Sequence, residues 1–327
     1  MSCSADRPAT ETRNAETAPS AGSVVRVDPA LDALIPADAK IEKLADGFIF
    51  TEGPIYMPDG SLLFSDVPAN VIYKWTPDGK ASEFLKPSGY DKDDAPQGAF
   101  IGSNGLTLDK DGRLIICQHG NGQVVRIEKD GSKTVLAAKY QGKRLNSPND
   151  LVYKSDGSLY FTDPPYGFVK QDDDPKKELK FNGIFRLRPD GKLDLLVDDM
   201  TRPNGLAFSP DEKFLYVANS DPAKKIWMRY EVKDDGTLGK GEVFFDVTSQ
   251  QAEGLPDGLK VDKLGNIWAT GPGGVWIFSP EGKHLGTVAP TEVPANCHWG
   301  GEDGKTLYMT ARKGLYRITT NVEGIRP

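Results

Sequence analysis

The apolar positions of this chain fall in short runs that are separated by turns rich in Pro, Asp and Gly. One unit recurs six times: a polar residue opens an apolar strand, a turn follows, and a second apolar or aromatic strand returns. Short runs of this kind between Gly-containing turns predict β-hairpins. The copies cover residues 51–67, 103–119, 148–164, 203–219, 256–272 and, in degraded form, 295–311.

A second hairpin follows the first in five of the six units, so that each unit has four antiparallel strands. Units of this size, repeated along the chain, are typical of the blades of a propeller. The last unit ends with a single strand at 314–318, and we expect residues 39–50 to supply its fourth strand. The prediction is an all-β, six-bladed β-propeller that forms one domain over residues 24–327, with its ring closed by an N-terminal strand.

Residues 1–23 differ from the rest, because they are rich in Ala, Thr, Ser, Pro and Glu and nearly lack large apolar side chains. Such a segment is predicted to be a disordered tether. Its Cys-Ser-Ala-Asp start resembles the mature end of a bacterial lipoprotein, which would place a lipid on Cys3 and the protein in the periplasm or envelope. An ordinary terminus with an incidental cysteine is the alternative, and a cytoplasmic location stays open.

Composition excludes several classes of protein. A net charge of −7 argues against nucleic acid or an anionic membrane as the main partner, a lipid on Cys3 aside. Three cysteines are too few for a disulfide framework, and Cys117 is predicted to be a buried free thiol. The chain has no GxSxG, HExxH or P-loop phrase, which removes serine hydrolases, zincins and NTPases. Nothing in the sequence predicts the oligomeric state.

The residue that opens each repeat is an oxygen-bearing side chain at the same phase of the unit. Strand parity places all six openers on one face of the disc, together with the long irregular stretches 86–102, 140–148 and 164–182. Long loops usually serve function, and propellers bind ligands near the axis, so this face is the predicted binding face. The openers are Glu52, Asn104, Asn149, Asn204, Asp257 and Asn296.

Four openers are predicted to hold one divalent cation on the axis: Glu52, Asn149, Asn204 and Asp257. Two carboxylates balance the charge of the ion, and oxygen-only ligands favour Ca²⁺, with Mg²⁺ or Mn²⁺ as substitutes. Zn²⁺ is less favoured because none of the four is His or Cys. The alternative is that Asn-Gly and Asp-Gly are ordinary turn pairs. Six residues at one phase, one of them a Glu, favour a common site.

Other polar residues are expected to surround this cation. Asn104 and Asn296 share the phase and are predicted to contact the substrate or support the ligands. His119 and His298 are candidates for substrate contact, with purely structural roles as the alternative. The ends of three second strands carry residues that are expected to support the metal ligands, namely Asp66, Asp163 and Asn219.

Four phrases in combination resemble the gluconolactonase family, which includes regucalcin: TEGP at 51–54, Asn-Asp after a Pro at 148–150, RPNG at 202–205 and PDG at 256–258. The resemblance covers roughly residues 40–320, and the phrase at 161–167 looks most like the bacterial gluconolactonase branch. It implies a six-bladed propeller, one axial divalent metal held by the same four openers, and hydrolysis of sugar lactones. Regucalcin-type members carry an Arg where this chain has Ser147, and Arg144 nearby becomes a candidate for substrate contact.

The residue types suggest a mechanism for such an enzyme. The cation would polarise the lactone carbonyl, and Asp257 would act as general base on a water molecule. Two alternatives stay open. The same scaffold could hydrolyse a phosphotriester or another ester, or the face could bind a protein or glycan without catalysis.

Overall fold

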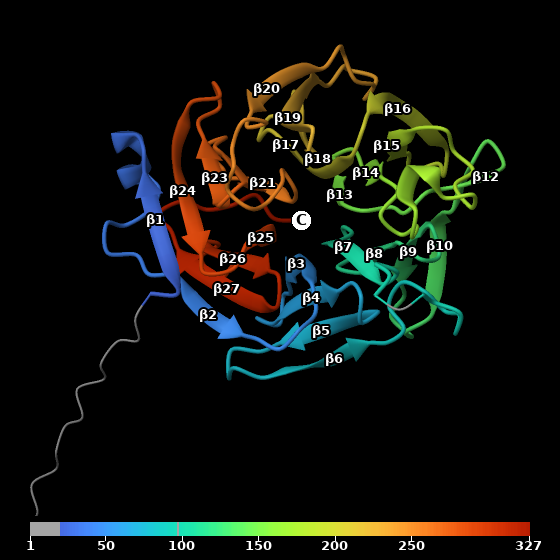
Figure 1. Cartoon of the computed structure of the whole chain (residues 1–327), viewed down its shortest axis with the longest axis horizontal. Coiled ribbons are helices and arrows are strands. Elements are labelled where there is room, and N and C mark those ends of the chain that lie inside the picture. Colours follow the sequence, from blue (N-terminus) through green and yellow to red (C-terminus); the bar gives the residue numbers. More distant parts are fainter. Residues whose placement is uncertain (1–19, 97) are drawn as a thin grey trace, which may run out of the picture.

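The computed structural model describes residues 20–96 and 98–327 and contains six antiparallel sheets arranged around a central axis (Figure 1). It confirms the predicted six-bladed propeller. The first three blades consist of β3 (Thr51–Tyr56), β4 (Leu62–Asp66), β5 (Val71–Trp75) and β6 (Ala81–Leu85); β7 (Ser103–Leu108), β8 (Leu114–Gln118), β9 (Gln123–Ile127) and β10 (Lys133–Ala137); and β13 (Leu151–Tyr153), β14 (Leu159–Asp163), β15 (Asn182–Leu187) and β16 (Leu193–Met200).

The last three blades follow the same order from the axis outward. They consist of β17 (Pro203–Phe208), β18 (Phe214–Asp221), β19 (Lys224–Glu231) and β20 (Glu242–Asp246); β21 (Leu259–Val261), β22 (Ile267–Gly271), β23 (Gly274–Phe278) and β24 (His284–Pro290); and β25 (Pro294–Gly300), β26 (Thr306–Ala311) and β27 (Gly314–Thr319). Between blades two and three lies a small hairpin of β11 (Lys139–Tyr140) and β12 (Lys143–Arg144), and η2 (Gln171–Asp173) lies in the loop after β14.

The ring closes between the two ends of the domain. Strand β2 (Glu42–Ala45) pairs with β27, with Lys43 opposite Tyr316, and so supplies the fourth strand of the last blade as predicted. Figure 1 shows these blue and red strands side by side. The pairing covers the outer edge of β27 and joins the first and last segments of the domain, which closes the ring.

The N-terminal segment enters the fold earlier than the sequence analysis expected. Strand β1 (Gly22–Arg26) adds a fifth strand to blade five by pairing with β24, and η1 (Pro29–Ala33) then buries Leu31 completely. The predicted tether boundary after residue 23 is therefore wrong by at least two residues. Cys3 and the other residues of 1–19 lie outside the described residues. Among the residues described, no helix is long and apolar enough to span a membrane.

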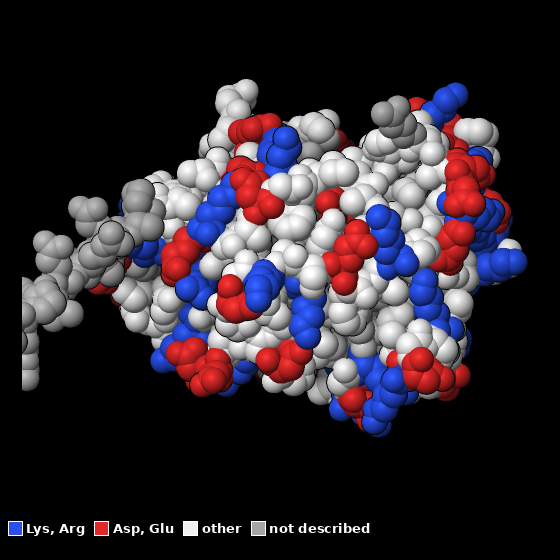
Figure 2. Space-filling model, turned by 90° about the horizontal axis from the view of Figure 1, so that it is seen from below, with Lys and Arg blue, Asp and Glu red and all other residues white. Residues whose placement is uncertain are grey.

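Apolar side chains fill the spaces between neighbouring blades. At the closing interface Leu62, Phe64 and Trp75 of blade one form a buried cluster with Tyr308 and Leu315 of blade six. Burial of this kind stabilises the ring at roughly 25 cal/mol per Å² of apolar surface. Acidic and basic side chains alternate on the side of the molecule shown in Figure 2 rather than gather into one area of a single sign.

The glycine after an opening residue is required by close approach between blades. A Cβ on Gly105 would lie 2.6 Å from the carbonyl oxygen of Asn149, and a Cβ on Gly205 would lie 2.4 Å from that of Asp257. Neither glycine has a positive φ, so neither serves as a turn residue. The turn interpretation of these pairs is therefore incorrect here: the small residue lets adjacent openers crowd around the axis.

Candidate active site at the axial cavity

The openers surround a cavity of about 510 Å³ on the face that carries the long loops, which we term the loop face. Each inner strand starts at this face, so residues at the beginning of the strand reach the cavity. Phe100 from the 86–102 stretch and Tyr166 and Gln171 from the 164–182 stretch also line it, whereas no residue of the 140–148 stretch does. Five of the six openers line the cavity: Glu52, Asn104, Asn149, Asn204 and Asp257.

Three oxygens among the cavity-lining openers are buried and have no hydrogen-bond partner: Asn104 Oδ1, Asn149 Oδ1 and Asp257 Oδ1. The amide nitrogen of Asn204 donates to Ser220 Oγ at 3.1 Å, so its orientation too is set by a neighbour. Leaving a buried acceptor unpaired costs about 1–3 kcal/mol, so several in one cavity indicate a ligand that donates hydrogen bonds or a cation that accepts oxygen lone pairs. The donor set of carboxylate and amide oxygens fits a hard divalent cation.

The cavity contains two carboxyl groups, Glu52 and Asp257, whose negative charges would repel each other. Burial, with a contribution from Asp150, raises the pKa of Glu52 to about 7. Burial also raises the pKa of Asp257 well above its usual range, and Glu52 and Asp150 add to the shift. Glu52 Oε2 accepts a hydrogen bond from the backbone nitrogen of Gly53 at 2.9 Å, which opposes the shift. A cation between the two carboxylates would remove the conflict.

His119 orients one of the proposed metal ligands. Its Nδ1 lies 3.1 Å from the carbonyl oxygen of Phe100 and its Nε2 lies 3.4 Å from Asn149 Nδ2. We assign the proton to Nδ1, because a carbonyl can only accept and an amide nitrogen can only donate. Burial lowers the pKa of His119 to about 4, so the ring is neutral at pH 7 and turns the Asn149 oxygen away from itself.

The residues at the ends of the second strands brace the turns that lead into the openers. Each accepts hydrogen bonds from backbone nitrogens a few residues before an opener. Burial raises the pKa of Asp163 to about 7. Asp66 accepts from Ile49 at 2.9 Å and Phe50 at 3.1 Å, Asp163 from Asn146 at 2.7 Å, and Asn219 from Arg202 at 2.8 Å.

Asn296 is the one opener that does not line the cavity. Its Nδ2 donates to Glu52 Oε2 at 3.1 Å, and its Oδ1 accepts from the backbone nitrogen of Cys297 at 2.9 Å. Both ends of the amide are thus occupied by protein groups. The structure supports its alternative role as a support for Glu52 rather than a contact with substrate.

Arg144 does not reach the cavity, so its predicted contact with substrate is corrected. Its guanidinium donates to the carbonyl oxygens of Leu145, Asn146 and Gly120 at 2.5–2.8 Å and stacks 4.9 Å from the Phe168 ring. An arginine saturated by backbone acceptors stabilises the loops that surround the site. Sequence spacing could not reveal this, because the acceptors come from two separate loops.

His298 lies at the other end of the axis, and its predicted contact with substrate is also corrected. It is buried in a small cavity of about 140 Å³ with Leu106 and Leu151, near the face that carries the tight hairpin turns, which we term the turn face. His298 comes two residues after Asn296, at the same position of the repeat as Leu106 and Leu151. Residues at this position lie further along the inner strand than the openers and therefore closer to the turn face.

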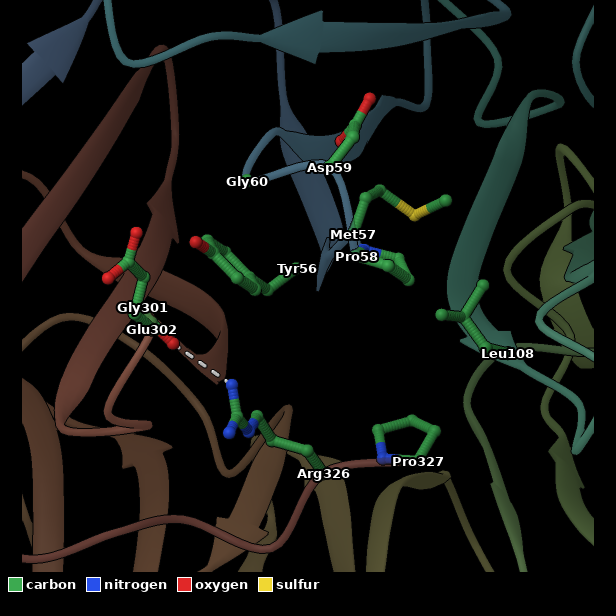
Figure 3. Close-up of a pocket in the computed structure, with 10 residues that line it drawn as sticks. All are labelled: Tyr56, Met57, Pro58, Asp59, Gly60, Leu108, Gly301, Glu302, Arg326 and Pro327. Carbon is green, nitrogen blue, oxygen red and sulfur yellow. Dashed lines mark hydrogen bonds between the residues drawn. The ribbon is translucent and has the colours of Figure 1, made fainter.

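A wider cavity of about 440 Å³ opens on the turn face (Figure 3), between the 57–60 turn and residues 301–302. Arg326 crosses it and donates to the carbonyl oxygen of Gly301 at 3.0 Å. None of the openers lines this cavity. Tyr56, which does, stands at the far end of the same strand that begins beside Glu52.

Several residues of the site were not singled out from the sequence. Arg202 lines the cavity and its guanidinium bonds Asp172 and, at 3.2 Å, Gln171 Oε1. Tyr166 is half-buried and donates to the carbonyl oxygen of Ser220 at 3.2 Å. The RPNG phrase was a signal for Arg202, and the length of the 164–182 loop was a signal for Tyr166. Neither signal indicates which side chain points into the cavity.

The fold and the cavity define a six-bladed propeller with an axial site of oxygen ligands on its loop face. The family model described as SMP-30/Gluconolactonase/LRE-like region matches residues 50–313. The chain belongs to this family, which confirms the resemblance seen in the sequence.

Individual relatives agree with this assignment. A gluconolactonase from Zymomonas mobilis is 42% identical over 317 residues, which is 93% of this chain and 87% of the relative. A solved gluconolactonase from Xanthomonas campestris is 32% identical, superposes with a TM-score of 0.80, and covers 92% of this chain and 96% of its own. A regucalcin from Agrobacterium tumefaciens shares the fold at 21% identity, with a TM-score of 0.68 and coverage of 87% and 95%.

Proposed function

We propose that this chain is a metal-dependent hydrolase that opens a small sugar-type lactone. The family and the relatives named gluconolactonase support the lactone as substrate class. The observation that carries the metal is the set of three unpaired, buried oxygens in one cavity, which also contains two carboxylates. Glu52, Asn149, Asn204 and Asp257 would hold the ion, with Ca²⁺ favoured by the all-oxygen donors.

An ion held by Glu52, Asn149, Asn204 and Asp257 would supply Lewis-acid chemistry to the lactone carbonyl. Asp257 is the proposed general base for the attacking water, because a carboxylate has two oxygens and can hold an ion with one and accept a proton on the other. The new C–O bond forms as the ring C–O bond breaks, and the ring oxygen leaves with the proton that Asp257 accepted. The product is the open hydroxy acid.

Two sides of the cavity suit a sugar lactone in different ways. Phe50 and Phe100 meet edge to face with ring centroids 5.2 Å apart and offer an apolar wall that excludes water. On the rim stand Arg202, Gln171 and Asp221, whose polar groups can bond sugar hydroxyls. A cavity with one apolar wall and few polar groups is the usual form of a small-molecule site.

The test is hydrolysis of a panel of lactones, simple esters and a phosphotriester, followed by a pH indicator. We expect turnover of sugar lactones that a chelator abolishes and Ca²⁺ restores. Preference for the ester or phosphotriester would overturn the substrate class. Lactone turnover that persists after the removal of metal would overturn the mechanism.

A further inference from the structure

Two charged residues interrupt the internal repeat. The residue after the opener is Asp150 in blade three, whereas four other blades have Gly there. The residue three positions after the opener is Lys260 in blade five, and every other blade has an uncharged residue there. The counterparts are Gly53, Gly105, Gly205, Gly258 and Cys297 for Asp150, and Ile55, Thr107, Val152, Ala207 and Trp299 for Lys260.

Asp150 and Lys260 form an ion pair near the axis. Lys260 Nζ lies 3.7 Å from Asp150 Oδ2, although the residues come from blades two apart in the ring. The side chain of Asp150 is 3% exposed and that of Lys260 is 18% exposed. A buried charge is costly unless it is paired, and replacing such a pair by apolar groups is often neutral or stabilising. Stability of the fold alone therefore gives no reason to place charges here.

A single amide connects this ion pair to a proposed metal ligand. Asn296 Nδ2 lies 3.1 Å from Glu52 Oε2 and 3.4 Å from Asp150 Oδ2. The amide cannot turn over without losing the bond between its oxygen and the backbone nitrogen of Cys297. Asp150 is thus held one side chain away from Glu52, close enough for its charge to act on the metal position.

The charges along the axis then balance. Glu52, Asp257 and Asp150 contribute three negative charges, and Lys260 supplies one positive charge. The net charge of −2 is balanced by one divalent cation. We propose that Asp150 and Lys260 are positioning residues that hold Glu52 through Asn296 and match the charge of the axis to a divalent ion. The inference rests on the metal site of the proposed function and adds the part that selects the charge of the ion.

A double-mutant cycle tests this inference through metal binding rather than activity. Calorimetry on the full-length, metal-free protein gives the affinity for Ca²⁺, and Tb³⁺ luminescence gives the affinity for a trivalent ion. We expect Asp150→Asn to weaken Ca²⁺ binding by about tenfold or more, because Lys260 is left as an unpaired positive charge. Adding Lys260→Met to Asp150→Asn should restore the affinity to within about threefold of the wild type.

The trivalent ion gives the second measurement. Loss of Lys260 from the wild type leaves an excess negative charge, so Lys260→Met should shift the Tb³⁺ to Ca²⁺ preference toward Tb³⁺ by about tenfold. Lys260→Arg should leave the preference unchanged. Lys263→Met, which removes a surface pair with Glu323, is the matched control and should change neither affinity.

The outcomes separate the two proposals. A wild-type protein that binds neither ion would defeat the metal site of the proposed function. A wild type that binds Ca²⁺ while Lys260→Met changes nothing in the Asp150→Asn background would overturn this inference alone. Thermal melts identify any variant that is merely unfolded. The decisive comparison is Asp150→Asn with and without Lys260→Met. If the pair only stabilised the fold, removing Lys260 as well would not restore the affinity for Ca²⁺.

Discussion

The two ends of the propeller axis contain the same kinds of residue but differ in what those residues leave unpaired. Each end has a buried histidine next to the axis, His119 at the loop face and His298 at the turn face, and burial lowers the pKa of both, to about 4 and about 3. His119 contacts the side chain of Asn149, whereas His298 Nδ1 lies 2.6 Å from the carbonyl oxygen of Trp299. Only the first histidine orients an oxygen that has no other partner.

The cavities show the same contrast. The loop face and the turn face have cavities of similar size, about 510 and 440 Å³. The oxygens of Asn104, Asn149 and Asp257 stand unpaired at the loop face, while at the turn face the carbonyl of Gly301 is occupied by Arg326. Volume therefore does not distinguish the functional end of the axis. The unpaired acceptor oxygens that line one cavity do, because buried polar groups usually have a partner. The other buried side-chain atoms without a partner among the described residues line neither cavity: Trp75 Nε1, Trp227 Nε1, Trp299 Nε1, Asn146 Oδ1 and Asp163 Oδ1.

The largest effect is expected at Asp257. Asp257→Asn keeps the size of the side chain but removes the base, so kcat should fall by about 10²- to 10⁴-fold. Asp59→Asn at the turn-face cavity is the matched control and should keep wild-type kcat. Steady-state kinetics on a lactone measures both. Equal activity of the two variants would mean that the loop face is not the catalytic end.

A smaller effect is expected at Asn149. Asn149→Ala removes one of the unpaired oxygens, and affinity for Ca²⁺ should fall by about 10- to 100-fold. Its metal-free melting temperature should change much less, since the oxygen makes no hydrogen bond in the protein. Calorimetry and thermal melts on the same sample check the two statements. A large loss of metal-free stability with unchanged Ca²⁺ affinity would contradict the assignment.

The histidines provide a direct comparison of the two ends. His119→Gln should lower kcat/KM by about tenfold, because Asn149 loses its orienting partner. His298→Gln should lower it less than about twofold, since the ring contacts the backbone of the turn-face end. The rate should show no ionisation of His119 between pH 5 and pH 8, given its pKa of about 4. Equal losses of kcat/KM in the two variants would contradict the assignment of an orienting role to His119 alone.

The smallest effect concerns the dependence of stability on pH. Glu52 and Asp163 have pKa values raised to about 7 in the metal-free fold, whereas the unfolded chain has ordinary values near 4. The folded state therefore binds more protons, and stability should decrease as the pH rises from about 4 through 7. Chelated protein should melt a few degrees lower at pH 7.5 than at pH 5.5.

Two further melts separate the contributions to this decrease. Added Ca²⁺ should raise the melting temperature most at pH 7.5, where the carboxylates of the cavity are ionised. Asp163→Asn should flatten part of the decrease, because Asp163 has a raised pKa. Its effect on Ca²⁺ affinity should be smaller than that of Asn149→Ala, because Asp163 does not line the cavity and acts only through the Asn146 backbone. A chelated protein that becomes more stable with rising pH would contradict the raised pKa values.

The sequence alone determined the architecture and the phase of the site. Six turns at matching positions predict six blades, and the phase of the opener predicts which end of each inner strand it occupies, because every inner strand runs the same way along the axis. A missing fourth strand in the last unit was enough to predict closure by residues 39–50. These properties follow from local pattern and repetition.

Only the tertiary structure decided which residues of the loop face reach the cavity. Arg144 lies in the small hairpin between blades two and three, and Gln171 lies in η2. The direction of each side chain depends on hydrogen bonds to distant segments that no repeat encodes. The same holds for Asn296, which is bound by Glu52, and for β1, which joins blade five through pairing with a distant strand. Repetition specifies position along a strand, whereas contacts between distant segments arise only when the ring closes.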